Sequence, residues 1–150
     1  MRVSVLLIAA VVLLAARPAQ SVVAVAQPLG VSVDNDSVTF RFVPEDFRMV
    51  VNGRTSRWMR LRELRIREVT VAGRWNQWSP EAWPLHSRGR SWELTCPLSA
   101  VADRDTVQFK FVINEEWWVQ PPPDTRNQLN SGNHDTTMNL FFIRPHEREE

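Results

Sequence analysis

The distribution of hydrophobic residues after position 26 constrains the fold most strongly. Apolar residues occur there in short runs separated by Asn, Asp, Gly and Pro, and no stretch of helix length shows the 3.6-residue period of an amphipathic helix. In the clearest run, TVQFKFVI at 106–113, every second residue is apolar. Such alternation places the apolar side chains on one face of a half-buried strand. The pattern therefore predicts an all-β domain.

Seven or eight short strands are expected. The predicted segments are 38–43, 47–51, 68–72, 91–97, 106–113, 116–119 and 136–143. Segment 56–66 alternates less regularly and fits either a strand or a short helix. Asn52-Gly53 is a strong hairpin turn signal after 47–51, and three consecutive prolines predict that 120–133 is a loop. Because nothing suggests a strand–helix–strand alternation, the expected architecture is a two-sheet antiparallel β-sandwich.

The N-terminal segment has the features of a signal peptide. A positive start is followed by an apolar run of 14 residues at 3–16, which is shorter than a membrane span, and then by Ala24-Val25-Ala26. These features predict a signal peptide over 1–26, with Gln27 as the first mature residue. An uncleaved anchor is the alternative, because 21–26 could extend the hydrophobic stretch. The expected location is periplasmic, extracellular or membrane-anchored, with membrane contact only through this segment.

The remaining chain is long enough for one domain, expected at 27–145 and followed by a charged tail at 146–150. Removal of 1–26 leaves 16 Lys and Arg against 17 Asp and Glu. The mature net charge is therefore near −1. Nucleic-acid-binding domains are normally strongly basic, so no nucleic-acid partner is expected.

The sequence lacks the constellations that catalysis requires. Its three histidines show no metal-ligand spacing, and there is no Gly-x-Ser-x-Gly elbow or phosphate-binding glycine loop. Glu115 and Glu116 are adjacent, so in a strand they point to opposite faces and cannot form a catalytic pair. The single cysteine, Cys96, lies in an apolar alternation typical of an inert, buried thiol. We expect no enzyme activity, no metal site and no cofactor.

The aromatic content points instead to binding. The chain has seven Trp, seven Phe and no Tyr, and seven indoles exceed the needs of such a core. Sugar rings stack their apolar faces on exposed aromatic planes and bind polar groups through their hydroxyls. Three segments combine such residues: 76–78, Lys110 together with 116–118, and 127–135. Trp117 and Trp118 are adjacent, so in an extended strand one of them must face outward.

The order of these motifs resembles a known family. VTVAGRWNQWS at 69–79, the later Pro84-Leu85 and RSWE at 90–93, VQFKFVIN at 107–114 and Trp117 are similar to the glycogen-binding domain of the AMP-activated protein kinase β subunit. They are equally similar to the related family 48 carbohydrate-binding modules and to the N-terminal E-set domains of glycogen branching and debranching enzymes (isoamylase N-terminal-like). The resemblance covers about 68–143 and implies an immunoglobulin-like (E-set) sandwich that binds an α-glucan such as glycogen, starch or a maltooligosaccharide.

The resemblance also implies roles for individual residues. Trp78 and Trp117 match the two stacking tryptophans, and Lys110 matches a lysine that hydrogen-bonds sugar hydroxyls. Asp135 or Asn133 matches the binding asparagine of the loop that holds the ligand. Together with neighbouring residues from the three segments, the expected carbohydrate-binding set is Asn76, Trp78, Lys110, Trp117, Trp118, Asn133 and Asp135.

The chain departs from the family pattern at Asp135, which stands in the place of the binding asparagine unless Asn133 takes that role, and in three further places. Trp75 stands where the family has Phe, the turn at 114–116 lacks the usual Gly, and 44–67 looks like an insertion. The alternative function is therefore an E-set or immunoglobulin-like module that holds a protein partner at the cell envelope, through the same aromatic surface or through 44–67, without binding sugar.

Overall fold

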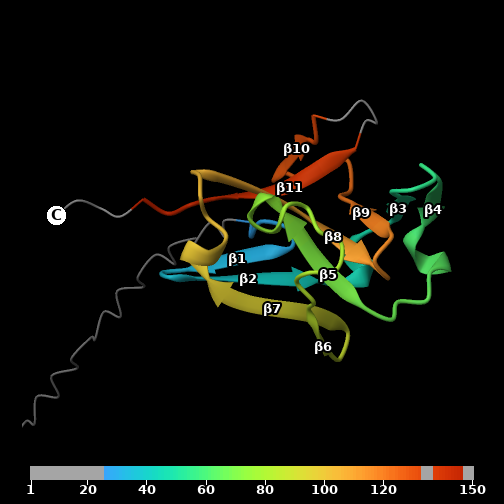
Figure 1. Cartoon of the computed structure of the whole chain (residues 1–150), viewed down its shortest axis with the longest axis horizontal. Coiled ribbons are helices and arrows are strands. Elements are labelled where there is room, and N and C mark those ends of the chain that lie inside the picture. Colours follow the sequence, from blue (N-terminus) through green and yellow to red (C-terminus); the bar gives the residue numbers. More distant parts are fainter. Residues whose placement is uncertain (1–25, 133–136, 147–150) are drawn as a thin grey trace, which may run out of the picture.

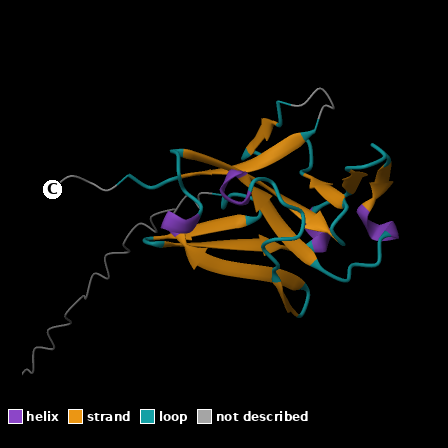
Figure 2. Cartoon of the chain, in the orientation of Figure 1, coloured by secondary structure: helices purple, strands orange, loops and turns teal. Residues whose placement is uncertain are grey.

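The computed structural model describes residues 26–132 and 137–146, which form two antiparallel β-sheets (Figure 1). Helical structure in this part of the chain is limited to single turns (Figure 2). These 3₁₀ turns are η1 (Pro44–Asp46), η2 (Leu61–Glu63), η3 (Arg74–Asn76) and η4 (Leu98–Ala100). No helix among the described residues is long and apolar enough to cross a membrane. The all-β prediction is confirmed.

The smaller sheet contains four strands in the order β1-β2-β7-β6. They are β1 (Val31–Asp34), β2 (Ser37–Phe42), β6 (His86–Arg88) and β7 (Ser91–Pro97). The apolar alternation of β7 turns Trp92, Leu94 and Cys96 toward the core, where they are partly buried. The expectation that this strand carries an apolar inner face is confirmed.

The larger sheet contains seven strands in the order β10-β11-β8-β9-β3-β4, with β5 paired to β8. They are β3 (Met49–Asn52), β4 (Trp58–Arg60), β5 (Val69–Gly73), β8 (Thr106–Ile113), β9 (Trp117–Gln120), β10 (Gln128–Asn130) and β11 (Met138–Ile143). On one edge β8 pairs with β11 through its first half and with β9 through its last two residues, while β5 pairs along the other edge. Strand β8 is therefore the centre of this sheet.

The core lies between the two sheets and consists largely of phenylalanines. Phe40 and Phe109 meet edge to face at a centroid distance of 5.1 Å, and Phe42 lies 5.3 Å from Phe111. All four side chains are fully buried. Because β8 alternates, its residues of even number face away from this core. That outer face of the larger sheet carries the candidate site.

Segment 44–67, predicted as an insertion, extends the larger sheet. Its strands β3 and β4 form a hairpin, and β3 also pairs with β9, so β4 is the edge strand. The turn predicted from Asn52-Gly53 is present: the side chain of Asn52 accepts hydrogen bonds from the backbone N–H groups of Arg54 and Thr55. Segment 56–66, which was open between strand and helix, contains β4 followed by η2.

Three short strands were not predicted. They are β1, β6 and β10, which have three or four residues each and lie at sheet edges. Strand β10 falls inside the predicted loop 120–133. Strands β6 and β10 contain His, Ser, Arg, Gln and Asn, residue types without strong strand preference. Tertiary pairing, rather than local propensity, places these segments in the sheets.

Candidate functional site

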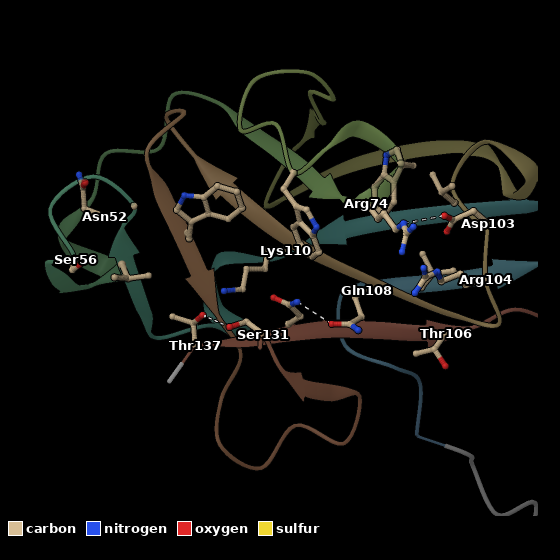
Figure 3. Close-up of a pocket in the computed structure, with 18 of the residues that line it drawn as sticks. Asn52, Ser56, Arg74, Asp103, Arg104, Thr106, Gln108, Lys110, Ser131 and Thr137 are labelled. Carbon is tan, nitrogen blue, oxygen red and sulfur yellow. Dashed lines mark hydrogen bonds and ion pairs between the residues drawn. The ribbon is translucent and has the colours of Figure 1, made fainter. Parts of the chain in front are cut away.

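A groove of about 950 Å³ lies mainly over the outer face of the larger sheet (Figure 3). Its aromatic lining consists of Trp58, Trp75, Trp78 and Trp118, and its uncharged polar lining includes Asn52, Ser56, Gln108, Ser131, Thr137 and Asn139. Figure 3 shows Lys110 in the middle, Asn52 and Ser56 at one end, and Arg74, Asp103 and Arg104 at the other. The groove thus combines apolar planes with many hydrogen-bonding groups.

The register of the β8–β9 hairpin decides which of two adjacent indoles lines this groove. Trp118 is opposite Val112 on the outer face, whereas Trp117 is opposite Ile113 on the core face. Trp118 accordingly lines the groove. Trp117 is only 8% exposed, belongs to the core, and donates from Nε1 to Glu116 Oε1 at 3.0 Å. The expectation that Trp117 is an exposed stacking residue is therefore wrong, and Trp118 is the outward member of the pair.

Trp78 reaches the groove from the loop after β5. Gln77 and Trp78 both have left-handed backbone conformations, with φ of 58° and 57°. The N–H of Trp78 donates to the carbonyl of Gly73 at 2.8 Å, which closes the loop. Trp75 lies beside Gly73, where a Cβ would overlap the Trp75 ring. Trp75 also stacks on Phe40 at 5.5 Å, so the loop is anchored on the core.

Asn76 belongs to the framework of this loop and is not among the groove-lining residues. Its Oδ1 accepts from the N–H of Gly73 at 3.0 Å, and its Nδ2 donates to the carbonyl of Val71 at 3.0 Å. These bonds hold the side chain against β5. The expectation that Asn76 contacts a ligand is not met by this geometry, and its role is to shape the loop that carries Trp78.

The floor of the groove is polar. Lys110 is 7% exposed and lines the groove from the outer face of β8. Next to it, Asn139 Nδ2 donates to Gln108 Oε1 at 2.9 Å, and Thr137 Oγ1 donates to Ser131 Oγ at 2.9 Å. These residues come from β8, β11 and the chain after β10. Lys110 thus shares the floor of the groove with amides and hydroxyls from three segments.

Trp58 was not predicted as a site residue. It is 44% exposed and lines the groove from edge strand β4. Trp58 is opposite Val51, which is opposite Trp118, so one cross-strand row joins the two indoles. Two strand spacings separate their backbones by about 10 Å. The Asn52-Gly53 turn signal and the alternation after it could have identified Trp58, had 56–66 been assigned to the returning strand.

Two further predicted residues, Asn133 and Asp135, lie outside the described residues, so their predicted contacts stay predictions.

Within 26–132 and 137–146, no group of three His, Cys, Asp or Glu side chains is arranged to hold a metal ion. Burial raises the pKa of the Cys96 thiol above its ordinary value. No family model matches the chain, and a comparison with curated proteins found no match.

Proposed function

We propose that this protein is an exported, non-catalytic module of the immunoglobulin-like (E-set) type that binds an α-glucan. The observation that carries the proposal is the convergence of Trp58, Trp78 and Trp118 on one groove. These indoles come from β4, the loop after β5, and β9, and they line the groove together with Lys110, which is 7% exposed. Separate segments thus supply aromatic planes to one concave surface with a polar floor.

The groove suits a sugar chain better than an apolar ligand. A pyranose presents an apolar C–H face to an indole and hydroxyl groups at its edge, and the groove has both kinds of partner. Stacking of planar rings on exposed aromatic side chains is worth about 1–3 kcal/mol per platform in nucleic-acid complexes. Two or three such platforms correspond to micromolar to millimolar affinity after the cost of association. The resemblance over 68–143 favours an α-glucan among sugars.

The backbone at Trp78 supports a binding role. A left-handed conformation costs a bulky residue of L configuration roughly 1–2 kcal/mol, and here two consecutive residues, Gln77 and Trp78, adopt it. Glycine would relieve this strain at either position. Strained residues persist where the surrounding structure over-determines them, often at binding sites. The strained conformation of this loop positions the indole of Trp78 at the groove.

The test is a titration of intrinsic tryptophan fluorescence with maltoheptaose, with cellohexaose as the β-linked control. A saturable shift with maltoheptaose alone is expected. Replacement of Trp58 and Trp78 together by Ala should remove the shift, because both rings are partly exposed, without changing the thermal transition. The control is Trp92→Phe in the smaller sheet, away from the groove. The proposal fails if maltoheptaose gives no shift, and co-purification of an envelope protein in that case would favour the protein-binding alternative.

A further inference from the structure

Charge is strongly segregated along the chain. Residues 48–67 contain seven arginines and one glutamate, a net charge of +6. The rest of 27–150 contains nine Lys and Arg against sixteen Asp and Glu, a net charge of −7. The near-neutral total therefore conceals a strongly basic segment.

This segment consists of the β3–β4 hairpin, η2 and the residues that follow as far as Arg67, and it is here called the basic hairpin (residues 48–67). It lies at the right-hand end of the molecule in Figure 1. Its arginines are all exposed to solvent: Arg48, Arg54, Arg57, Arg60, Arg62, Arg65 and Arg67. Among the described residues, the ion pairs join Arg41 to Glu93 and Arg74 to Asp103, so neither involves the basic hairpin. Seven like charges concentrated this way repel one another and attract anions.

The basic hairpin is continuous with the groove. Ser56 and Trp58 belong to the hairpin and line the groove. Arg60 is two residues beyond Trp58 in β4, so it stands on the same face of the sheet. A ligand stacked on Trp58 that extends along β4 meets a guanidinium group next.

The charged residues within the groove have the same bias. The described charged residues that line it are Lys110, Arg74 and Arg104 against the single carboxylate Asp103. A neutral glucan would need no such excess of positive charge.

We infer that the ligand is an acidic polysaccharide whose sugar rings occupy the groove and whose phosphate, sulfate or carboxylate groups contact the arginines of the basic hairpin. This inference rests on the proposed function, because it takes the groove to be the sugar site. A phosphorylated α-glucan is the form that agrees with both. Guanidinium groups bind phosphate and carboxylate oxygens through paired N–H donors.

A membrane surface fits the observations less well. Peripheral attachment to anionic lipid combines basic residues with several apolar side chains that enter the interface. Among the described residues, the exposed large hydrophobic side chains are Trp58, Leu129 and Ile143, and only Trp58 belongs to the basic hairpin. Trp58 also faces the groove. The hairpin therefore has charge without an inserting apolar face.

The experiment compares the binding of maltoheptaose and of maltoheptaose phosphorylated at glucose C6 to the full chain, by calorimetry at low and high salt. The first variant is Arg60→Glu with Arg62→Glu. The matched control is Arg88→Glu with Arg90→Glu, which makes the same charge change at exposed residues of β6 and of the turn that leads to β7. Equal net charge in the two variants isolates the position of the arginines from bulk electrostatics.

The phosphorylated oligosaccharide should bind about two- to thirtyfold more tightly at low salt, as expected for two exposed ion pairs. The preference should disappear at high salt, because the screening length falls from about 10 Å at 0.1 M to about 3 Å at 1 M. The variant at 60 and 62 should lose the preference and still bind maltoheptaose, while the control variant keeps it. The inference is overturned if the unmodified chain binds the two oligosaccharides with equal affinity. It is also overturned if the variant at 60 and 62 keeps the preference, or if the control variant at 88 and 90 loses it to the same extent.

Failure of the proposed function gives a different result. If maltoheptaose does not bind, polygalacturonate is the second probe. Polygalacturonate binding that the changes at 60 and 62 abolish keeps the acidic-polysaccharide inference and rejects the α-glucan. If no acidic glycan binds, the inference is rejected; sedimentation with phosphatidylglycerol vesicles, or salt-sensitive self-association, would then assign the basic hairpin to a membrane or to a second copy.

Discussion

Alanine at two adjacent positions, Trp117 and Trp118, should produce opposite defects. Trp117 is 8% exposed and lies in the core, and truncation of a buried Trp to Ala typically costs about 3–5 kcal/mol. For a domain of this size, that loss lowers the melting temperature by roughly 10–20 °C. Trp118 stands on the outer face, over Gly53. Its truncation removes one stacking platform, worth about 1–3 kcal/mol of binding, or about five- to 150-fold in Kd, with a smaller effect on stability.

Scanning calorimetry measures the first quantity, and titration with maltoheptaose at a temperature where both variants are folded measures the second. Trp117→Phe is the control, because it retains an aromatic ring in the core and should recover most of the stability. The reasoning depends on the pairing of Ile113 with Trp117. It would be refuted if Trp117→Ala abolished binding without a change in melting temperature, or if Trp118→Ala unfolded the domain and Trp117→Ala did not.

Three further outcomes follow from individual contacts. Gly53→Ala places a Cβ 2.7 Å from Trp118 Nε1, so the substitution should displace the indole ring. Binding of maltoheptaose should weaken while the midpoint of urea denaturation stays unchanged. Unaltered maltoheptaose binding would contradict this reasoning. Asn127→Ala removes three hydrogen bonds, one from the N–H of Leu29 and two to the carbonyls of Leu29 and Phe141. The free energy of unfolding measured by urea denaturation should fall by about 2–4 kcal/mol. A loss of less than about 1 kcal/mol would contradict this expectation. The pKa of the Cys96 thiol is raised by burial, so at neutral pH its reaction with a disulfide reagent should be slower in the folded chain than in urea. The rate in the folded chain should increase as the pH rises toward that pKa. Equal rates in the folded chain and in urea would argue against burial of the thiol.

Sequence reasoning succeeded where alternation and turn chemistry act locally. The predicted strands at 106–113 and 91–97 coincide with β8 and β7. Each of these strands packs one face against the other sheet. Apolar residues are therefore required at alternate positions, and this alternation is visible in the sequence. The Asn52-Gly53 turn also follows from local chemistry, since the Asn side chain bonds to its own turn.

It failed where pairing depends on distant segments. The orientation of the adjacent indoles is the clearest case. Three residues, 114–116, connect the paired positions 113 and 117, and Asn114 and Glu115 both have positive φ. One residue more or fewer in this connection would reverse the face of each indole in β9. A resemblance in residue order cannot determine this, because the length and geometry of the turn decide it.

The groove also depends on the basic hairpin, which lies outside the segments that resemble the known family. Without β3, strand β9 would be a sheet edge with unpaired backbone groups, and Trp118 would lack the floor that Val51 and Gly53 provide. Strand β4 then adds Trp58 to the same cross-strand row. The segment interpreted from the sequence as an insertion therefore supports Trp118 and supplies Trp58. Its excess of positive charge lies next to both indoles.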